Sequence, residues 1–174
     1  MSLLEIIKEP NPILRKKADN VLNVDDDIRK LMDNMLETMY QAPGIGLAAP
    51  QVGILKKVIV IDLSKDDEPK KPFFIVNPKI IWKSEELSSR EEGCLSIPGH
   101  FAEVVRPKKC KLQYLDYNGK KQEVEADDLL STCIQHEVDH CDGVLFIDYL
   151  SKLKKDMIIK KLKKQKKELD KAIL

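Results

Sequence analysis

Two histidines spaced four residues apart constrain this chain more than any other feature. They are His136 and His140, in the run Gln-His-Glu-Val-Asp-His at 135–140. On an α-helix such residues lie one turn apart on the same face, so both imidazoles can bind a single metal ion. Glu137 lies roughly 100° around the helix from His136 and can take a proton from water without binding the metal. The run therefore predicts a helix with a site for metal-assisted hydrolysis, in preference to a chance pair of surface histidines.

Two imidazoles leave a metal ion short of ligands, so a third ligand is expected from elsewhere in the chain. Cys94 is the strongest candidate, because a thiolate binds divalent transition metals strongly. Taken alone, however, Cys94 fits an ordinary buried thiol better than a ligand. The other cysteines are expected to pack in the core, and Cys133 faces either the core or a pocket because it lies three residues before His136.

The composition limits the class of protein. A chain of 174 residues can bury one sizeable core, and no repeat or Gly/Ser linker divides it, so we expect a single domain over residues 1–174. The formal net charge of +1 argues against DNA as a partner, and no apolar run is long enough to cross a membrane. Four irregularly spaced cysteines and no secretion signal favour a reducing, cytoplasmic setting.

The hydrophobic pattern predicts an α+β fold, with mainly antiparallel sheets around a central metal-binding helix and a further helix near each end of the chain. Apolar residues at three- and four-residue steps predict the N-terminal helix at 26–41, and acidic residues at its start favour capping. The metal-binding helix is expected at 127–142, ended by Gly143. Strands are expected at 57–63, 73–81, 109–117 and 121–126, the last two joined by a tight turn at Asn118-Gly119.

A third segment, Gly-Ile-Gly-Leu-Ala-Ala-Pro-Gln at 44–51, follows the first predicted helix. Its two glycines permit the close approach of a ligand or another backbone, and the amide of Gln51 can donate to an oxyanion. The segment lacks the Gly-Lys-Ser/Thr ending of a phosphate-binding loop. By itself it predicts only a turn that leads into a strand.

Together, the runs at 44–51, 92–96 (Glu-Gly-Cys-Leu-Ser) and 135–140 closely resemble the three signature motifs of the peptide deformylase family. The order and spacing match over nearly the whole chain, in the form typical of Gram-negative bacteria and organelles. The resemblance implies that Cys94, His136 and His140 bind the metal. It also implies Fe²⁺ as the natural ion, with Zn²⁺, Ni²⁺ or Co²⁺ able to replace it, whereas ligand counting alone favours zinc.

The resemblance also implies roles for other residues. The reaction would remove the formyl group from N-formylmethionyl nascent peptides and release formate. Glu137 would act as the base toward water and then as the acid toward the departing amine. Gln51 and the backbone N–H of Leu95 would donate hydrogen bonds to the oxyanion. Gly46 would pair with the substrate backbone. Ile45, Leu129 and Cys133 match positions of the methionine pocket, although core packing explains each equally well. Glu92 and Arg106 match a buried pair that supports the cysteine loop, and an exposed salt bridge at the rim is the alternative.

Three positions depart from the family pattern. Pro50 removes a backbone donor just before Gln51, Arg90 stands where an apolar pocket residue is common, and Cys141 could place an oxidisable thiol near the metal. None of these departures removes a catalytic role.

Residues 151–174 carry ten lysines and three acidic residues, so they differ from the rest of the chain. One interpretation is a solvated amphipathic helix packed on the domain, and the other is docking to ribosomal RNA, which the resemblance supports. A partial apolar stripe is formed by Leu153, Met157, Ile158, Leu162 and Leu169.

Two other functions fit part of the sequence. A zincin-like metallopeptidase uses the same His-Glu-x-x-His helix, but it usually takes its third ligand from a downstream residue. A non-catalytic, metal-stabilised ribosome-binding module has no use for Glu137, which binds no metal. The metallopeptidase alternative also leaves the segment at 44–51 unexplained.

Overall fold

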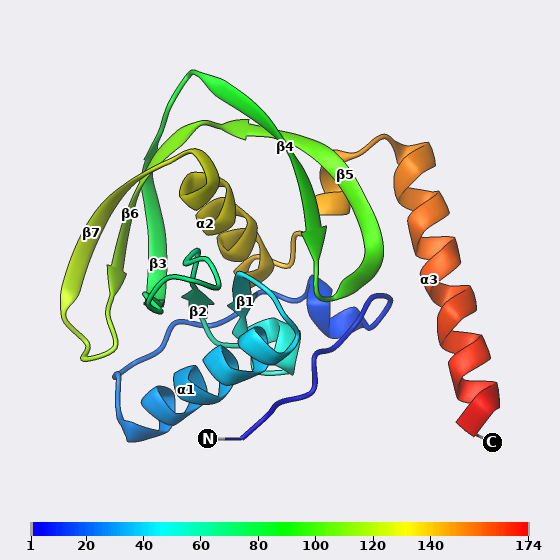
Figure 1. Ribbon diagram of the computed structural model, residues 1–174, viewed down its shortest axis with the longest axis horizontal. Coiled ribbons are helices and arrows are strands. Elements are labelled where there is room, and N and C mark those ends of the chain that lie inside the picture. The colour runs from blue at the N-terminus through cyan, green and yellow to red at the C-terminus, as the bar shows by residue number, and fades with distance from the viewer. Residues whose placement is uncertain (1, 174) are drawn as a thin grey trace.

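The computed structural model describes residues 2–173 and contains two antiparallel sheets and three α-helices in one domain (Figure 1). The five-stranded sheet has the order β1-β2-β3-β6-β7, and a two-stranded sheet pairs β4 with β5. The helices are α1 (Asp26–Gln41), α2 (Asp128–Cys141) and α3 (Lys152–Ile173). The strands are β1 (Gly46–Ala48), β2 (Val58–Ile61), β3 (Phe73–Lys83), β4 (Leu87–Cys94), β5 (Ile97–Pro107), β6 (Lys109–Leu115) and β7 (Lys121–Asp127). The predicted α+β class is confirmed.

Helix α1 begins and ends where the sequence predicts. The Asp25 side chain accepts a hydrogen bond from the Ile28 amide and so satisfies one of the free donors of the first turn. Four apolar side chains of its stripe, at 28, 32, 35 and 39, are buried against β1 and β2. The methionines of this helix are therefore core residues, which agrees with their helical spacing.

Helix α2 lies at the centre of the molecule and contacts strands of both sheets (Figure 1). Asp127 is its N-cap, and Gly143 follows its end with φ +75°, as predicted. A Cβ at Gly143 would lie 2.4 Å from the carbonyl oxygen of Arg15, so this close approach also requires glycine. Buried polar residues on α2, among them Gln135, Glu137 and His140, are unusual in a core helix and mark it as the carrier of a site.

Some predicted elements differ from the structure. The β4–β5 hairpin was not predicted, and the strand expected at 109–117 ends at Leu115. Asn118 and Gly119 lie in the hairpin turn between β6 and β7, as predicted, and the Gly119 amide donates to the Asp116 carbonyl at 2.9 Å. Five residues, 116–120, join β6 to β7, and within this loop only Gly119 has a positive φ. The Asp116 carboxylate accepts the amides of Asn118 and Lys120, so it organises the longer loop.

Helix α3 packs on the domain with only part of its predicted apolar stripe (Figure 1). Leu162 is buried in a cluster with Leu14, Ile97 and Phe146, and Ile158 packs against the same cluster. Leu153, Met157 and Leu169 are exposed, so the predicted stripe is wrong for these three residues. Among the described helices, none has the length and hydropathy needed to cross a membrane.

Candidate metal centre and active-site cleft

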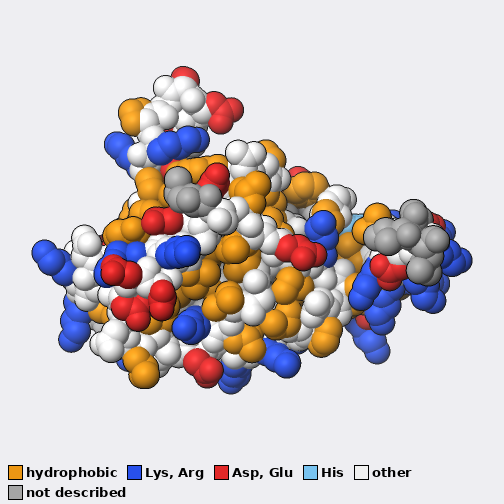
Figure 2. All heavy atoms as spheres, turned by 90° about the horizontal axis from the view of Figure 1, so that it is seen from below, with side chains coloured by type: hydrophobic (Ala, Val, Ile, Leu, Met, Phe, Trp, Pro, Cys, Tyr) orange, Lys and Arg blue, Asp and Glu red, His pale blue; other side chains and the backbone are white. Residues whose placement is uncertain are grey.

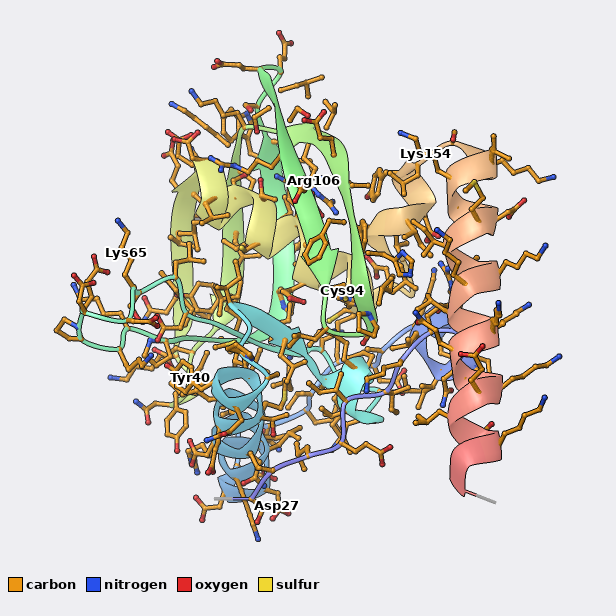
Figure 3. All side chains as sticks on the ribbon, turned by 45° about the vertical axis from the view of Figure 1, so that its right-hand side comes forward. Asp27, Tyr40, Lys65, Cys94, Arg106 and Lys154 are labelled. Carbon is orange, nitrogen blue, oxygen red and sulfur yellow. The ribbon has the colours of Figure 1, made fainter. Side chains whose placement is uncertain are left out.

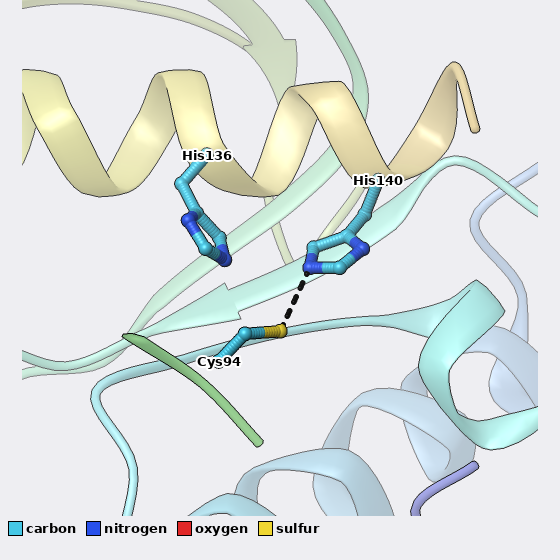
Figure 4. A group of neighbouring side chains, drawn as sticks. All are labelled: Cys94, His136 and His140. Carbon is cyan, nitrogen blue, oxygen red and sulfur yellow. Dashed lines mark hydrogen bonds between the residues drawn. The ribbon is translucent and has the colours of Figure 1, made fainter. Parts of the chain in front are cut away.

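Cys94, His136 and His140 converge on one point between α2 and the end of β4 (Figure 4). Their ligand atoms all lie within 4.8 Å of one another, and Cys94 Sγ is 3.3 Å from His140 Nε2. Metal bonds to sulfur and imidazole are about 2.0–2.3 Å long, so donors this close can share one ion. The structure thus joins the cysteine segment to the histidine helix, although His136 comes 42 positions after Cys94 in the sequence.

Buried groups around these donors fit a metal ion. His140 is buried, and its Nδ1 atom has no hydrogen-bond partner among the described residues. Burial lowers the pKa of His140 well below its ordinary value, which favours the neutral imidazole that metals bind. The donor set of one thiol and two imidazoles suits Fe²⁺, Zn²⁺, Ni²⁺ or Co²⁺ better than a hard ion such as Mg²⁺.

A network of buried charged side chains contacts the Nδ1 atom of His136. Glu92 Oε1 lies 2.9 Å from His136 Nδ1, and both Glu92 oxygens accept hydrogen bonds from Arg106, at 2.7 and 3.0 Å. Glu92 and Arg106 are buried, so the alternative of an exposed rim salt bridge is wrong. Figure 3 places Arg106 on the hairpin above Cys94.

This network of side chains extends to Asp139 and Tyr149, which were not predicted as site residues from the sequence. Arg106 also donates to Asp139 Oδ2 at 2.9 Å, and the Tyr149 hydroxyl donates to the same oxygen at 2.7 Å. The Arg106 guanidinium lies 4.6 Å from the centre of the Tyr149 ring. Asp139 stands inside the histidine run, three residues after His136, so its position on α2 was a usable signal for this contact.

Glu137 is buried beside the three donors and faces β1. A Cβ at Gly46 would lie 2.6 Å from Glu137 Oε2, so only glycine leaves room for the carboxyl group there. Glu137 Oε1 has no hydrogen-bond partner among the described residues. Burial raises the pKa of Glu137 to about 7, and the nearby His136 opposes that rise.

Gln51 reaches the same centre from the short helix η2 (Ala49–Val52). Its Nε2 atom donates to Ser96 Oγ at 3.1 Å and lies 3.5 Å from Cys94 Sγ, while its Oε1 accepts the Ala48 amide. Pro50 occupies the first turn of η2, where a helix has no internal partner for the missing N–H, so this departure is accommodated. Leu95 lies in the turn between β4 and β5, next to Cys94.

The N-terminal segment connects these two sides of the site. The Ile7 amide donates to the Gln51 carbonyl at 2.7 Å, and the Glu9 amide donates to the Ser96 carbonyl at 2.9 Å. No motif marks residues 7–9, because the contacts use only backbone atoms, so the sequence analysis missed them.

A cleft of about 840 Å³ opens onto this centre. Ile45, Gly46, Leu129, Cys133 and Glu137 line it, together with Cys94, Leu95 and His136. Ile45 and Leu129 are 46% and 40% exposed, so they are side chains of a cleft and not of the core. Cys133 is buried, and it both lines the cleft and packs in the core cluster, so the two positions that the sequence left open for it, core and pocket, both apply.

Cys141 does not face the metal centre. It is 1% exposed in the core cluster beneath the large sheet, and burial raises its pKa to about 12. Its thiol is therefore protonated and shielded, so the expectation of an oxidisable thiol near the metal is wrong.

Comparison with known proteins agrees with this geometry. Residues 3–156 match the family model for polypeptide deformylase. The chain is 60% identical to the peptide deformylase of Pelagibacter ubique over 95% of this chain and 96% of that protein, and 53% identical to that of Rhizobium meliloti over 96% of each. The crystal structure of peptide deformylase from Ehrlichia chaffeensis in complex with actinonin superimposes with a TM-score of 0.91, at 44% identity over 95% of this chain and 98% of that chain. A plant peptide deformylase structure gives a TM-score of 0.88 at 37% identity over 97% of this chain and 92% of that chain. The chain therefore belongs to the polypeptide deformylase family of enzymes.

Proposed function

We propose that this chain removes the formyl group from the formyl-methionine at the N-terminus of nascent proteins and releases formate. The observation that carries the proposal is the convergence of Cys94, His136 and His140 beside Glu137 on the wall of one cleft. A metallopeptidase of the zincin type is not favoured, because the third donor is an upstream thiol and the chain belongs to the deformylase family.

The proposed metal is Fe²⁺, held by Cys94, His136 and His140, with Zn²⁺, Ni²⁺ or Co²⁺ able to replace it. When bound, such an ion acts as a Lewis acid toward the formyl carbonyl and makes water a stronger nucleophile. His140 Nε2 lies 3.3 Å from Cys94 Sγ, and Glu92 contacts His136 Nδ1, so Nε2 is the proposed ligand atom of each imidazole.

Glu137 is proposed to move the proton in the reaction. The oxygen of water forms a bond to the formyl carbon, and the bond between that carbon and the methionine nitrogen breaks. Glu137 takes a proton from the attacking water and gives it to the departing amine, so formate and a free amino group result. Its free Oε1 atom, in a site that excludes most solvent, supports this role.

Gln51 and the backbone N–H of Leu95 are proposed to stabilise the oxyanion that develops on the formyl oxygen. Removing one such donor typically costs about 2.7–4 kcal/mol in the transition state. The side-chain amide of Gln51 is held in place by two hydrogen bonds, because its oxygen accepts the Ala48 amide and its nitrogen donates to Ser96. The nitrogen therefore lies toward Cys94 and needs no large reorganisation to donate at this centre.

Gly46 is proposed to pair with the backbone of the substrate. The Asp62 amide donates to the Ile45 carbonyl, and Gly46 is opposite Ile61 in the register of β1 and β2. Gly46 and Ile61 therefore form a non-hydrogen-bonded pair, and the N–H and C=O of Gly46 point away from β2. Since β1 is the edge strand of its sheet, an extended peptide can add to it.

Ile45, Leu129 and Cys133 are proposed to bind the methionine side chain. All three line the cleft next to Glu137 and His136, and they offer apolar atoms. Glu92 and Arg106 are proposed to hold His136 and the cysteine loop in place through their buried ion pair.

The lysine-rich helix α3 is proposed to bind the ribosome, and the cytoplasm is the proposed location of the protein. Figure 2 shows Lys and Arg side chains gathered around this helix at the right of the molecule. The test is to replace three lysines by glutamate, which reverses their charge, at Lys160, Lys163 and Lys164. This variant should bind ribosomes more weakly and should still turn over a short formyl-peptide. Unchanged ribosome affinity would contradict the docking role.

Formate release from formyl-Met-Ala-Ser tests the proposed activity. The protein is assayed without oxygen, the bound metal is quantified, and the same peptide without the formyl group serves as control. We expect formate from the first peptide and no cleavage of the second. Cleavage of the unformylated peptide would support a peptidase instead, and binding of metal without either reaction would support a non-catalytic module.

A further inference from the structure

Arg90 lies on the wall of the active-site cleft, on strand β4. Side chains alternate between the two faces of a strand, so Arg90 shares a face with Glu92. Leu129 and Cys133 of α2 line the same cleft. The guanidinium group therefore stands next to the proposed methionine pocket, two residues before the carboxylate that supports His136.

The guanidinium of Arg90 has almost no partners, in contrast to that of Arg106. Arg106 is 3% exposed and makes three hydrogen bonds to carboxylates. The Arg90 side chain makes no hydrogen bond to any residue between 2 and 173 in the structure, and its buried Nε atom is among the unpartnered polar atoms. A guanidinium carries five N–H donors, so Arg90 retains most of its capacity to bind an anion.

The one ion pair that Arg90 makes within residues 2–173 is long. Its Nη2 atom lies 3.8 Å from Asp128 Oδ1, and the Asp128 side chain is 58% exposed. Pairs of this kind contribute little, since solvent screens both charges. Asp128 therefore does not neutralise Arg90 to the extent that Glu92 and Asp139 neutralise Arg106.

We propose that Arg90 determines specificity by binding an acidic side chain in one of the first two substrate residues after methionine. This inference rests on the proposed deformylase function. The aliphatic stem of an arginine can continue an apolar wall while its charged head stays at the water-exposed end. At Arg90 that arrangement would leave the methionine pocket apolar, because the Nη2 end of the side chain lies toward Asp128 and the side chain is 37% exposed. The positive charge would then be available to the residues that follow methionine.

Matched formyl-peptides isolate the charge of the substrate. The peptides are formyl-Met-Asp-Ser and formyl-Met-Asn-Ser, and formyl-Met-Ala-Asp and formyl-Met-Ala-Asn, which differ within each pair only in an ionised carboxylate. The measured quantity is the ratio of kcat/KM for Asp over Asn in each pair. For the wild-type metal-loaded protein we expect a ratio of roughly two- to fivefold in favour of Asp at one of the two positions.

The variants separate Arg90 from other cations. Arg90→Gln should bring the ratio to about one, and Arg90→Lys should retain part of it because the positive charge remains. Arg29→Gln removes an arginine of α1 that does not line the cleft, so its ratio should match the wild type. Raising the salt concentration from about 0.05 to 0.5 M should lower the wild-type ratio, since ions screen a partly exposed pair.

Two results would overturn the inference. One is a wild-type ratio of one at both positions. The other is a preference for Asp that survives in Arg90→Gln, which would point to Lys8, the other Lys or Arg among the described residues of the cleft wall. Circular dichroism and formate release from formyl-Met-Ala-Asn check that each variant is folded and loaded. Absence of formate from every peptide would instead refute the deformylase function, and this inference with it.

Discussion

The Nδ1 nitrogen of His136 lies 2.9 Å from a carboxylate oxygen of Glu92. Burial raises the pKa of Glu92, but hydrogen bonds from His136 and Arg106 outweigh burial and hold that pKa below its ordinary value. Glu92 is therefore an ionised acceptor, and Nδ1 must carry the proton. This leaves Nε2 free to bind metal, so the contact between Glu92 and His136 selects the tautomer that the centre requires.

Replacing Glu92 by glutamine should weaken metal binding by about 10–100-fold, because the neutral amide no longer fixes the His136 tautomer or matches the Arg106 charge. The variant should also lose stability, since the buried Arg106 loses one of its two ionised partners and keeps only Asp139. Metal affinity is measured by competition with a chelator on folded protein. Glu91→Gln is the control, because Glu91 is exposed on the other face of β4. Equal affinity in the two variants would contradict the role of Glu92.

Replacing Glu137 by glutamine should lower kcat for formate release by about 10²–10⁴-fold, the usual contribution of a general base. Metal content should stay at the wild-type level, because Glu137 is not among the three donors. Stability should not fall much, since Glu137 Oε1 has no hydrogen-bond partner within the described chain. Metal analysis and formate release on the same sample check both statements. A parallel loss of metal and activity would instead identify Glu137 as a ligand.

Replacing Asp148 by asparagine should lower the free energy of unfolding at pH 7 by about 1–3 kcal/mol. Burial raises the pKa of Asp148, but hydrogen bonds from Arg15 and Lys155 outweigh burial and lower it. A lowered folded-state pKa stabilises the protein above the unfolded pKa of about 3.9, and the contribution disappears as pH falls through the folded-state value.

Urea unfolding of the wild type and Asp148→Asn at several pH values checks this sign. The difference between their free energies of unfolding should have its largest value at pH 7 and should shrink below about pH 4. Asp156→Asn, on the exposed side of α3, should show little difference at any pH. A difference that grows as the pH falls would contradict the assignment of the Arg15–Asp148 pair.

The sequence predicts the elements whose burial follows a simple period. Helix α1 has apolar residues at helical steps and Asp25 as its cap, and both its bounds match the structure. The strands β2 and β3 are rich in β-branched and aromatic residues. The histidine run predicts α2 correctly because two ligands on one face require a helix.

The β4–β5 hairpin could not be predicted from the sequence, because charged residues occupy its inward face. Glu92 and Arg106 on its inward face form a buried ion pair, and Arg90 on the same sheet lines the cleft. These charged residues stand where apolar ones are expected, so the segment lacks the alternation of apolar and polar residues that marks a strand. The position of Asp139 in the histidine run marks it as a neighbour of the site. Its partner Arg106, and the contact of Tyr149 with the same network, depend on this hairpin and could not be named without it. The role of Cys94 likewise needed the family resemblance, because a single cysteine does not reveal its partner.

The most direct test of the metal centre is the replacement of Cys94 by serine. Metal stoichiometry and formate release are measured on the same anaerobic preparation, with Cys110→Ala as a control that removes a buried thiol outside the cleft. Losing a ligand should cost at least as much as losing a residue that supports one, so we expect metal affinity and formate release to fall by at least about 100-fold. Wild-type metal content and full activity in folded Cys94→Ser protein would contradict the account of the site.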